Sequence, residues 1–464
     1  MDLSGVIELY KAHIIENTSK LIQIPSVEAA AQPGKPFGEA ADDALLFCLK
    51  LAQELGFMTG NVDGYAGYAQ MGEGDETLGI LVHLDVVPEG AGWTYPPFSG
   101  VVHDGKIYGR GAIDDKGPAI AALYAMKAVM DSEVCLRKKV RLIFGLDEES
   151  GWKDMEYYFK KEPMPETGIT PDGCYPVIYA EKGIADVAVK KCFKPSDFVT
   201  LRLSSVIGGE RPNMVADSCE CVFKPHGLNE KVLVSVETFF SITGERLQTS
   251  FDEKGALTIK ANGVSAHGST PQKGKNAIAI VLSFLATLGY GESEMERYLN
   301  LLNDKIGFDT KGIGLGIDCE DESGELTVNL GTLEANADGG MALLNIRYPV
   351  TFSEDALLQK IKEAFYDEDL EILVKGRHKP LYVPKDHPLV KKLLEVYNEQ
   401  TGQNADAIAI GGGTYARALK NAVAFGAVFP GKPDLAHQKD EYIEIEDLIL
   451  NAKIYAHAIA TLCI

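Results

Sequence analysis

The spacing of hydrophobic and polar residues in the first third of the chain predicts helices and strands in alternation. Apolar residues recur with a helical period at 4–22 and 41–55, and the continuous apolar run at 78–84 predicts a buried strand. A buried helix at 118–130 and a second buried strand at 139–146 follow. Because helices alternate with strands, this part of the chain is typical of an α/β domain with a mainly parallel sheet.

The pattern changes near residue 184. From there to about residue 380 the segments alternate residue by residue, as in ALTIKANGVSA (256–266) and MALLNIRYPV (341–350). Helix-like runs at 276–290 and 353–365 interrupt them. Alternation with a period of two is the pattern of half-buried antiparallel strands, so this segment is expected to be an α+β insert.

The helix-and-strand pattern returns after the insert and closes with a helix at 445–462. At 464 residues the chain exceeds what a single hydrophobic core usually spans. We therefore predict a discontinuous α/β domain at 1–183 and 381–464, with a mainly parallel mixed sheet flanked by helices. The insert at 184–380 is predicted to form a second domain, of α+β type, with an antiparallel sheet.

The charge balance narrows the choice of partners. The chain has 45 Lys and Arg residues against 67 Asp and Glu residues, a formal net charge of −22. Since no basic patch is evident, this balance argues against a nucleic acid or an anionic membrane as partner. The N-terminal helix is too polar to span a bilayer. Eight cysteines without a CxxC pair and no secretory leader favour reduced thiols, so we expect a cytoplasmic protein.

Acidic and histidine residues stand where the predicted α/β strands end, or in loops that lead back to them. Strand ends at one rim of an α/β sheet are where such domains build their sites, so these side chains could converge. Carboxylates and imidazoles without thiolates suit a pair of divalent metal ions such as Zn²⁺, Mn²⁺ or Co²⁺. The set consists of His83, Asp85, Asp114, Glu148, Glu149, Asp172 and His437.

Each of these residues could also have a purely structural role, without metal binding or catalysis. Asp114 or Asp115 could cap the helix that follows, and Asp172 could simply form a turn. The adjacent acids Glu148 and Glu149 could be a solvated acidic turn. Neighbouring side chains of a strand diverge, however, so if Glu149 binds a metal ion, Glu148 can face the cleft and accept a proton from water.

The motifs around these residues resemble those of one family. HLDVVP, GRGAIDDKGP, DEESGW, a later PD, GVSAHGSTP and a C-terminal HQ are similar to the motifs of the aminoacylase- and carnosinase-like di-metal peptidases. Among these the chain most resembles the PepV-type dipeptidases of bacteria, over essentially its whole length. The resemblance implies a metal-dependent dipeptidase that acts on small peptides. It also implies two divalent ions per chain, with Zn²⁺ the usual ion and Mn²⁺ or Co²⁺ the alternatives.

The resemblance also implies a set of metal ligands in the discontinuous domain, which becomes the catalytic domain. Asp114 would be the carboxylate that bridges both ions. His83 and Asp172 would complete the shell of one ion, and Glu149 and His437 the shell of the other. The peptide bond between Asp114 and Asp115 is expected to be cis, as is typical of this family.

Catalytic and substrate-binding roles follow from the same resemblance. Glu148 would be the general acid and base, and Asp85 would orient the ring of His83. The insert becomes a lid in which His267 stabilises the substrate carbonyl oxygen. The residues expected to bind the substrate are Asn213 and Arg347 in the lid, Gly413 in the GGGTYAR loop and, for the free α-amine, Asp115.

Two other functions remain open on the sequence alone. A deacylase of N-acyl amino acids, of the acetylornithine or succinyl-diaminopimelate type, would use the same ions with a different pocket on the amine side. A catalytically silent binding protein would keep the fold alone, although all the ligand types and Glu148 are present. The large lid favours a monomer, and a homodimer is the alternative.

Overall fold

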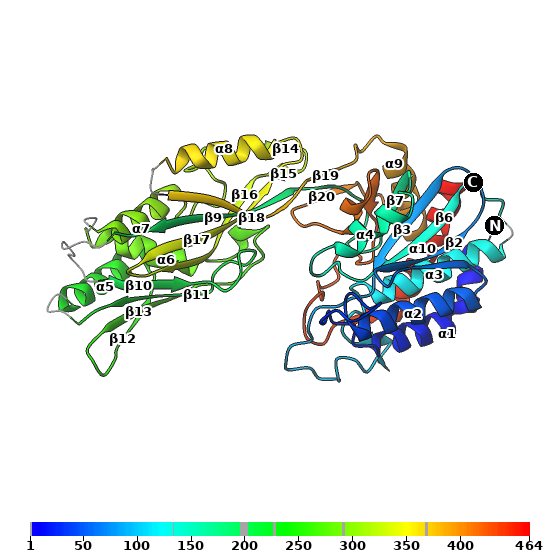
Figure 1. The fold of residues 1–464 in the computed structure, drawn as a ribbon, viewed down its shortest axis with the longest axis horizontal. Helices are drawn as coiled ribbons and strands as arrows, with labels where there is room; N and C mark the ends of the chain where they lie inside the picture. The colour runs from blue at the N-terminus through cyan, green and yellow to red at the C-terminus, as the bar shows by residue number, and fades with distance from the viewer. Residues whose placement is uncertain (1, 133, 195–202, 226–228, 290–292, 367–369) are drawn as a thin grey trace. The chain divides into compact units, whose positions relative to one another are not determined.

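The structure is a computed structural model that describes residues 2–132, 134–194, 203–225, 229–289, 293–366 and 370–464 (Figure 1). The chain divides into two compact units, and each is described by itself. Unit 1 consists of Met1–Ala180, Tyr382–Ile408 and Gly413–Ile464, and unit 2 of Glu181–Leu381 and Ala409–Gly412.

Within the described residues, unit 1 is built on a nine-stranded sheet with a parallel centre. The central strands β6, β3, β7 and β21 run parallel to one another. On one side β6 pairs with an antiparallel edge formed by β2 and β1, and on the other side β21 pairs antiparallel with β8. In order across the sheet the strands are β1 (Met58–Val62), β2 (Ala66–Met71), β6 (Lys139–Gly145), β3 (Thr77–His83), β7 (Thr167–Thr170), β21 (Ala422–Ala424), β8 (Ile178–Glu181) and β19 (Leu381–Tyr382), with β20 (Ile408–Ile410) paired to β8.

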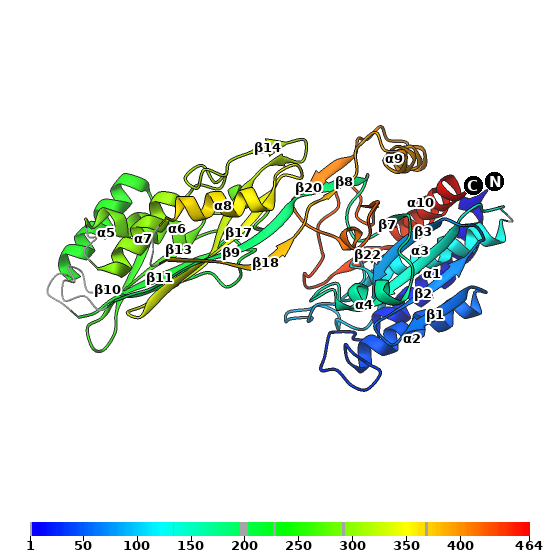
Figure 2. The same cartoon turned by 45° about the horizontal axis from the view of Figure 1, so that its top comes forward.

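Helices cover the central strands of unit 1, which fits the mainly buried residues of these strands. Helices α3 (Lys116–Asp131) and α10 (Ile445–Cys463) pack against β3 and β6, and α1 (Leu3–Ile22) packs against both helices (Figure 2). Helix α2 (Glu39–Glu54) packs on β1 and β2, and α9 (Pro388–Thr401) packs on α10. Within the described parts of the chain, no helix combines the length and the apolar character needed to cross a membrane.

A small second sheet of unit 1 brings two distant parts of the sequence together. Its order is β22 (Tyr442–Glu444), β5 (Lys106–Tyr108) and β4 (Val101–His103), with antiparallel pairing throughout. Because β22 pairs with β5, the loop that precedes β22 lies beside the loop that follows β5.

Unit 2 is built on an antiparallel sheet, with eight strands among the described residues. Alternation along β11 turns Cys219, Cys221 and Phe223 into the core, as the period-two pattern predicts. In order across the sheet the strands are β12 (Leu247–Phe251), β13 (Leu257–Asn262), β11 (Ser218–Phe223), β10 (Leu203–Gly208), β16 (Thr327–Ala335), β17 (Gly339–Tyr348), β9 (Gly183–Cys192) and β18 (Leu370–His378).

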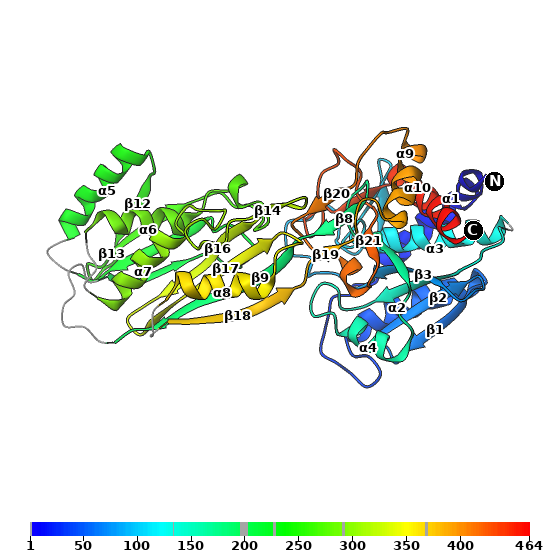
Figure 3. The ribbon, with the colours of Figure 1, turned by 90° about the horizontal axis from the view of Figure 1, so that it is seen from above.

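The predicted fold class is confirmed: a mixed, centrally parallel sheet with helices in one unit and an antiparallel α+β unit inserted in the chain. The prediction of only two helices in the insert was wrong. Its described residues contain four, α5 (Asn229–Thr243), α6 (Ala277–Thr287), α7 (Glu294–Lys305) and α8 (Glu354–Ala364). Helix α6 packs on β11, β13 and β16, and α7 packs on α6 and β17 (Figure 3). Residue 290 of the predicted run 276–290 lies outside the described residues.

Candidate active site

Three neighbouring parallel strands of unit 1 end at one edge of the sheet, and each leads into an acidic or histidine side chain. His83 is the last residue of β3, Glu148 and Glu149 follow β6, and Asp172 follows β7. In the register of β3 with β6, His83 stands opposite Gly145, so the two strands end side by side. The carboxyl edge of the parallel strands thus gathers these four side chains, as expected for an α/β site.

Two loops add the remaining candidates. Asp114 lies between β5 and α3, and His437 lies between β21 and β22. Since β5 and β22 pair, the two loops arrive at the same place. The predicted cis peptide bond between Asp114 and Asp115 is present.

The carboxylate of Asp114 lies between two imidazoles. His83 Nε2 is 2.9 Å from Asp114 Oδ1, and His437 Nε2 is 3.2 Å from Asp114 Oδ2. His437 Nε2 is also 2.9 Å from Glu149 Oε1. Each oxygen of Asp114 thus faces a different imidazole, which is the arrangement that a carboxylate bridging two metal ions requires.

The remaining donor atoms gather around His83. One donor atom each of His83, Asp114 and Glu149 lie within 4.8 Å of one another, and so do those of His83, Glu148 and Asp172. Together with His437, the structure brings together every residue that the sequence suggested as a metal ligand. The set consists of nitrogen and carboxylate oxygen donors without sulfur, which suits Zn²⁺, Mn²⁺ or Co²⁺.

Asp85 fixes the orientation of the His83 ring. His83 Nδ1 is 3.0 Å from the backbone carbonyl oxygen of Asp85, with a carboxylate oxygen of the same residue at 3.5 Å. A carbonyl oxygen only accepts, so Nδ1 carries a hydrogen, and Nε2 is the nitrogen that faces the site. The Asp85 carboxylate also accepts a hydrogen bond from the Glu149 backbone N–H at 3.0 Å. The residue therefore supports two ligands at once, as partners of metal-binding groups often do.

The charge around the two imidazoles favours bound cations. Burial lowers the pKa of His83, but the hydrogen bonds that its ring donates to Asp114 and Asp85 outweigh burial and raise that pKa well above its ordinary value. Hydrogen bonds to Asp114 and Glu149 raise the pKa of His437 to about 11. A divalent ion at the same nitrogen would take the place of the proton, since metal binding releases protons from its ligands. The residues present therefore fit two divalent ions.

Asp154, in helix α4 (Lys153–Lys161), stabilises the start of the loop that carries Glu148 and Glu149. The fully buried carboxylate of Asp154 accepts hydrogen bonds from the backbone N–H groups of Leu146 at 2.7 Å and Asp147 at 3.0 Å. It also accepts one from the hydroxyl of Tyr415. Sequence reasoning missed this support, because an aspartate in the first turn of a helix is common without any function.

Asp115, which the sequence suggested as a partner of the substrate amine, is buried beside His83. Its side chain is fully buried, and one carboxylate oxygen is 3.3 Å from the backbone N–H of His83, from which it accepts a hydrogen bond. Asp115 therefore supports the backbone at His83.

In unit 2, Asn213 and His267 lie side by side. Residues Met214 and His267 form a β-bridge, and the Asn213 carbonyl accepts a hydrogen bond from the Gly268 N–H at 2.7 Å. The backbone N–H of Ser269 donates to His267 Nδ1 at 3.2 Å. Since Nδ1 accepts, the neutral ring carries its hydrogen on Nε2, which makes Nε2 a donor.

Arg347 is held by its own unit. Its Nε donates to Asn345 Oδ1 at 2.9 Å, and its Nη1 donates to the carbonyl of Gly411 at 3.0 Å. The Asn345 amide is oriented in turn by Asp186, whose Oδ1 lies 2.6 Å from Asn345 Nδ2. The carbonyl that accepts from Arg347 Nη1 thus belongs to Gly411 of the GGGTYAR loop. Gly413, the residue of this loop that the sequence analysis proposed for substrate binding, belongs to unit 1.

The fold and the donor set together define a metal-dependent hydrolase. The edge of its parallel sheet and two adjoining loops bring two histidines and several carboxylates around Asp114, and such a set of ligands can hold metal ions that activate water.

Comparisons with known proteins give the family. Residues 79–461 match the model of Peptidase family M20/M25/M40. The chain is 45% identical to the protein named "Putative dipeptidase YtjP" of Bacillus subtilis, over 97% of both chains. It also matches the crystal structure of human carnosine dipeptidase 1 with a TM-score of 0.57 and 16% identity, covering 99% of this chain and 98% of that one. A further match is the YXEP protein of Bacillus subtilis, described as a dinuclear metal-binding peptidase, with a TM-score of 0.50, 12% identity and coverage of 98% and 99%.

The chain therefore belongs to peptidase family M20/M25/M40 and is a metallopeptidase. The resemblance to the aminoacylase- and carnosinase-like peptidases is confirmed.

Proposed function

We propose that the chain hydrolyses unblocked dipeptides at a dinuclear metal centre. The observation that carries the proposal is the placement of Asp114, whose two oxygens face two imidazoles from distant parts of the sequence. The dipeptide preference is supported by the 45% identity to a relative that is named a dipeptidase. We propose Zn²⁺ as the resident ion, with Mn²⁺ or Co²⁺ as alternatives that suit the same donors.

The ions would be held by His83, Asp114, Glu149, Asp172 and His437, and when bound they would supply Lewis-acid activation of water and of the scissile carbonyl. Glu148 stands beside these ligands, with a donor atom within 4.8 Å of those of His83 and Asp172. Its carboxylate accepts a proton from the attacking water and passes it to the nitrogen of the leaving amine. Asp85 keeps the His83 ring in place through the hydrogen on Nδ1.

Residues of unit 2 would bind the substrate. The Nε2–H donor of His267 suits the oxygen of the scissile carbonyl, where negative charge develops in the transition state. The guanidinium of Arg347 suits the terminal carboxylate of a short peptide, because a planar cation of this kind forms charge-assisted hydrogen bonds with carboxylates. Contacts at both ends of a dipeptide would hold the scissile bond in place and select for length. Asn213, beside His267, would contribute a further polar contact.

Replacing His267 by alanine is expected to lower kcat by about 10²–10³-fold, the usual effect of removing one oxyanion donor. Bound metal should stay unchanged, since His267 is not among the ligands. Steady-state kinetics with parallel metal analysis measure both quantities. His378→Ala, an exposed histidine on β18 of the same unit, is the matched control. An unchanged kcat in His267→Ala would make His267 only a turn residue.

Replacing Arg347 by lysine is expected to raise KM by about tenfold or more, with a smaller change in kcat. Lysine keeps the charge but loses the fork that grips a carboxylate, at a cost of about 1.5–3 kcal/mol for a charged hydrogen bond. The control is Arg377→Lys on β18, whose side chain is 69% exposed. A KM that stays at the wild-type value would remove Arg347 from substrate binding.

A panel of substrates separates the proposed function from its alternatives. The metal-loaded protein is given unblocked dipeptides, one tripeptide and several N-acetyl amino acids, and amine release is followed. Fast cleavage of the dipeptides is expected, with little or no cleavage of the others. Preference for acetylated substrates would instead indicate a deacylase, and no cleavage of any of them a binding protein.

A further inference from the structure

A buried arginine joins the two loops that carry Asp114 and His437. Only 2% of Arg110 is exposed, and its guanidinium faces the loop that precedes β22. Its Nη1 donates to the carbonyl of Gln438 and its Nη2 to the carbonyl of His437, both at 3.2 Å. Arg110 precedes Asp114 by four residues on one loop and thus bonds directly to the backbone of a candidate ligand on the other.

Glu441 completes the connection from the other side. Its carboxylate is fully buried, and Oε2 lies 2.7 Å from Arg110 Nη1. Its second oxygen, Oε1, accepts hydrogen bonds from the backbone N–H groups of Ile113 at 3.0 Å and Asp114 at 3.4 Å. Arg110 therefore holds the backbone at His437, and Glu441 holds the backbone at Asp114, in reciprocal fashion.

The loop of His437 needs such support, because its backbone is strained. His437 and Asp440 have φ values of +64° and +58°, in the left-handed region that residues with a side chain rarely adopt. Asp440 is itself tied down, since its carboxylate accepts hydrogen bonds from the backbone and hydroxyl of Thr94 at 2.6 and 3.1 Å. Such a conformation persists only where surrounding contacts determine it.

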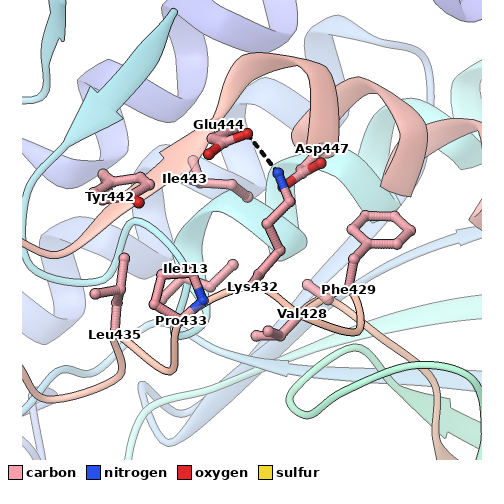
Figure 4. A pocket seen from close by; sticks show the side chains of 11 residues that line it. Ile113, Val428, Phe429, Lys432, Pro433, Leu435, Tyr442, Ile443, Glu444 and Asp447 are labelled. Atoms are coloured by element: carbon pink, nitrogen blue, oxygen red, sulfur yellow. Dashed lines mark hydrogen bonds and ion pairs between the residues drawn. The ribbon is translucent and has the colours of Figure 1, made fainter.

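A second ion pair on the same loop makes a useful contrast. Lys432 lies 2.6 Å from Glu444 and 3.0 Å from Asp447, beside a small pocket that Ile113 also lines (Figure 4). The Lys432 side chain is 36% exposed and pairs with two carboxylates. Exposed pairs of this kind usually contribute little to stability.

We propose that the buried Arg110–Glu441 pair positions Asp114 relative to His437 and so determines the affinity and the coordination geometry of the metal centre. The inference rests on the proposed dinuclear function, since it assigns two positioning residues to that centre. Neither side chain is proposed to touch an ion or the substrate. Their contacts reach the backbone of both loops, so a change in the pair moves the ligands without removing any of them.

The test measures metal binding in Arg110→Lys, Glu441→Gln and the control Lys432→Met. Lysine keeps the charge but cannot reach both carbonyls and Glu441 together, while glutamine keeps the size and one acceptor oxygen. Circular dichroism and thermal unfolding of the metal-free proteins establish that each variant folds. Calorimetric titration with Zn²⁺ then gives the number of ions and their Kd, and the visible spectrum of the Co²⁺-loaded protein reports coordination geometry.

The two positioning variants are expected to bind metal about 10–100-fold more weakly than the wild type, the usual effect of changing an outer partner of a metal ligand. Their Co²⁺ spectra should also change, which a general loss of stability would not produce. Lys432→Met should match the wild type in both measurements. Wild-type affinity and spectrum in both Arg110→Lys and Glu441→Gln would overturn the inference. A wild-type protein that binds no divalent ion would overturn the proposed function itself, whatever the variants do.

Discussion

Replacing Glu148 by glutamine will remove peptide hydrolysis while leaving the bound metal in place. Glutamine has nearly the same shape but no basic carboxylate, so it can neither accept a proton from water nor deliver one to the leaving amine. General acid–base catalysis of this kind contributes about 10²–10⁴-fold to a rate, and kcat should fall by that factor. The assigned metal ligands His83, Asp114, Glu149, Asp172 and His437 are all retained, so metal analysis should give the wild-type stoichiometry.

The control for this variant is Glu54→Gln at the end of α2, whose side chain is 61% exposed. It tests whether loss of any glutamate charge affects the rate, and it should behave as the wild type. A Glu148→Gln protein that keeps its turnover would contradict the role of Glu148. A variant that loses both turnover and metal would make Glu148 a ligand instead.

Replacing Asp114 by asparagine is expected to destroy the dinuclear centre. An amide offers one acceptor oxygen and no charge, so it cannot serve His83 and His437 as Asp114 does with its two oxygens. Bound metal should fall from two ions per chain to one or none, and hydrolysis should be lost with it. Metal analysis of the desalted protein after incubation with Zn²⁺ measures the first effect.

A mostly exposed aspartate of the same unit provides the comparison. Asp104 lies between β4 and β5 with 83% of its side chain exposed, so Asp104→Asn should keep both ions and full activity. Two ions bound with wild-type affinity in Asp114→Asn would show that Asp114 is not the bridge.

The elements of unit 1 could be predicted from the sequence because its strands have a strong and simple signal. β3 and β6 are buried on both faces and consist mainly of apolar residues, and α3, which lies between them in the sequence, is buried along most of its length. The site residues could be predicted for a related reason. Some of them stand at the ends of these strands, and the others lie in the sequence motifs GRGAIDDKGP and HQ. Because parallel strands end at the same edge of a sheet, the residues at the strand ends could be expected to lie close together.

The helices missed in unit 2 had weaker signals. Helix α5 is rich in β-branched residues, which favour strands, and it forms because Val232, Val236 and Phe239 share a helical face that enters the core. Helix α7 is polar, but its first turn contains a capping box of Ser293 and Glu296 that could have been recognised.

Apart from Asp85, the supporting residues of the site could not have been predicted from a single sequence. Arg110 and Glu441 are 331 residues apart, and Tyr415 and Asp154 are 261 residues apart. Each pair acts through contacts that exist only after the sheet has brought its loops together. No local pattern of residues distinguishes such an arginine or aspartate from one on a solvated surface.

The most direct test of a dinuclear dipeptidase is to strip the protein with a chelator and restore it with Zn²⁺, Mn²⁺ or Co²⁺ in steps. Bound ions per chain and the rate of cleavage of an unblocked dipeptide are measured on the same samples. The account predicts no hydrolysis by the stripped protein and a rate that reaches its maximum as the second ion binds. Full hydrolysis without metal, or a maximal rate with a single ion per chain, would contradict it.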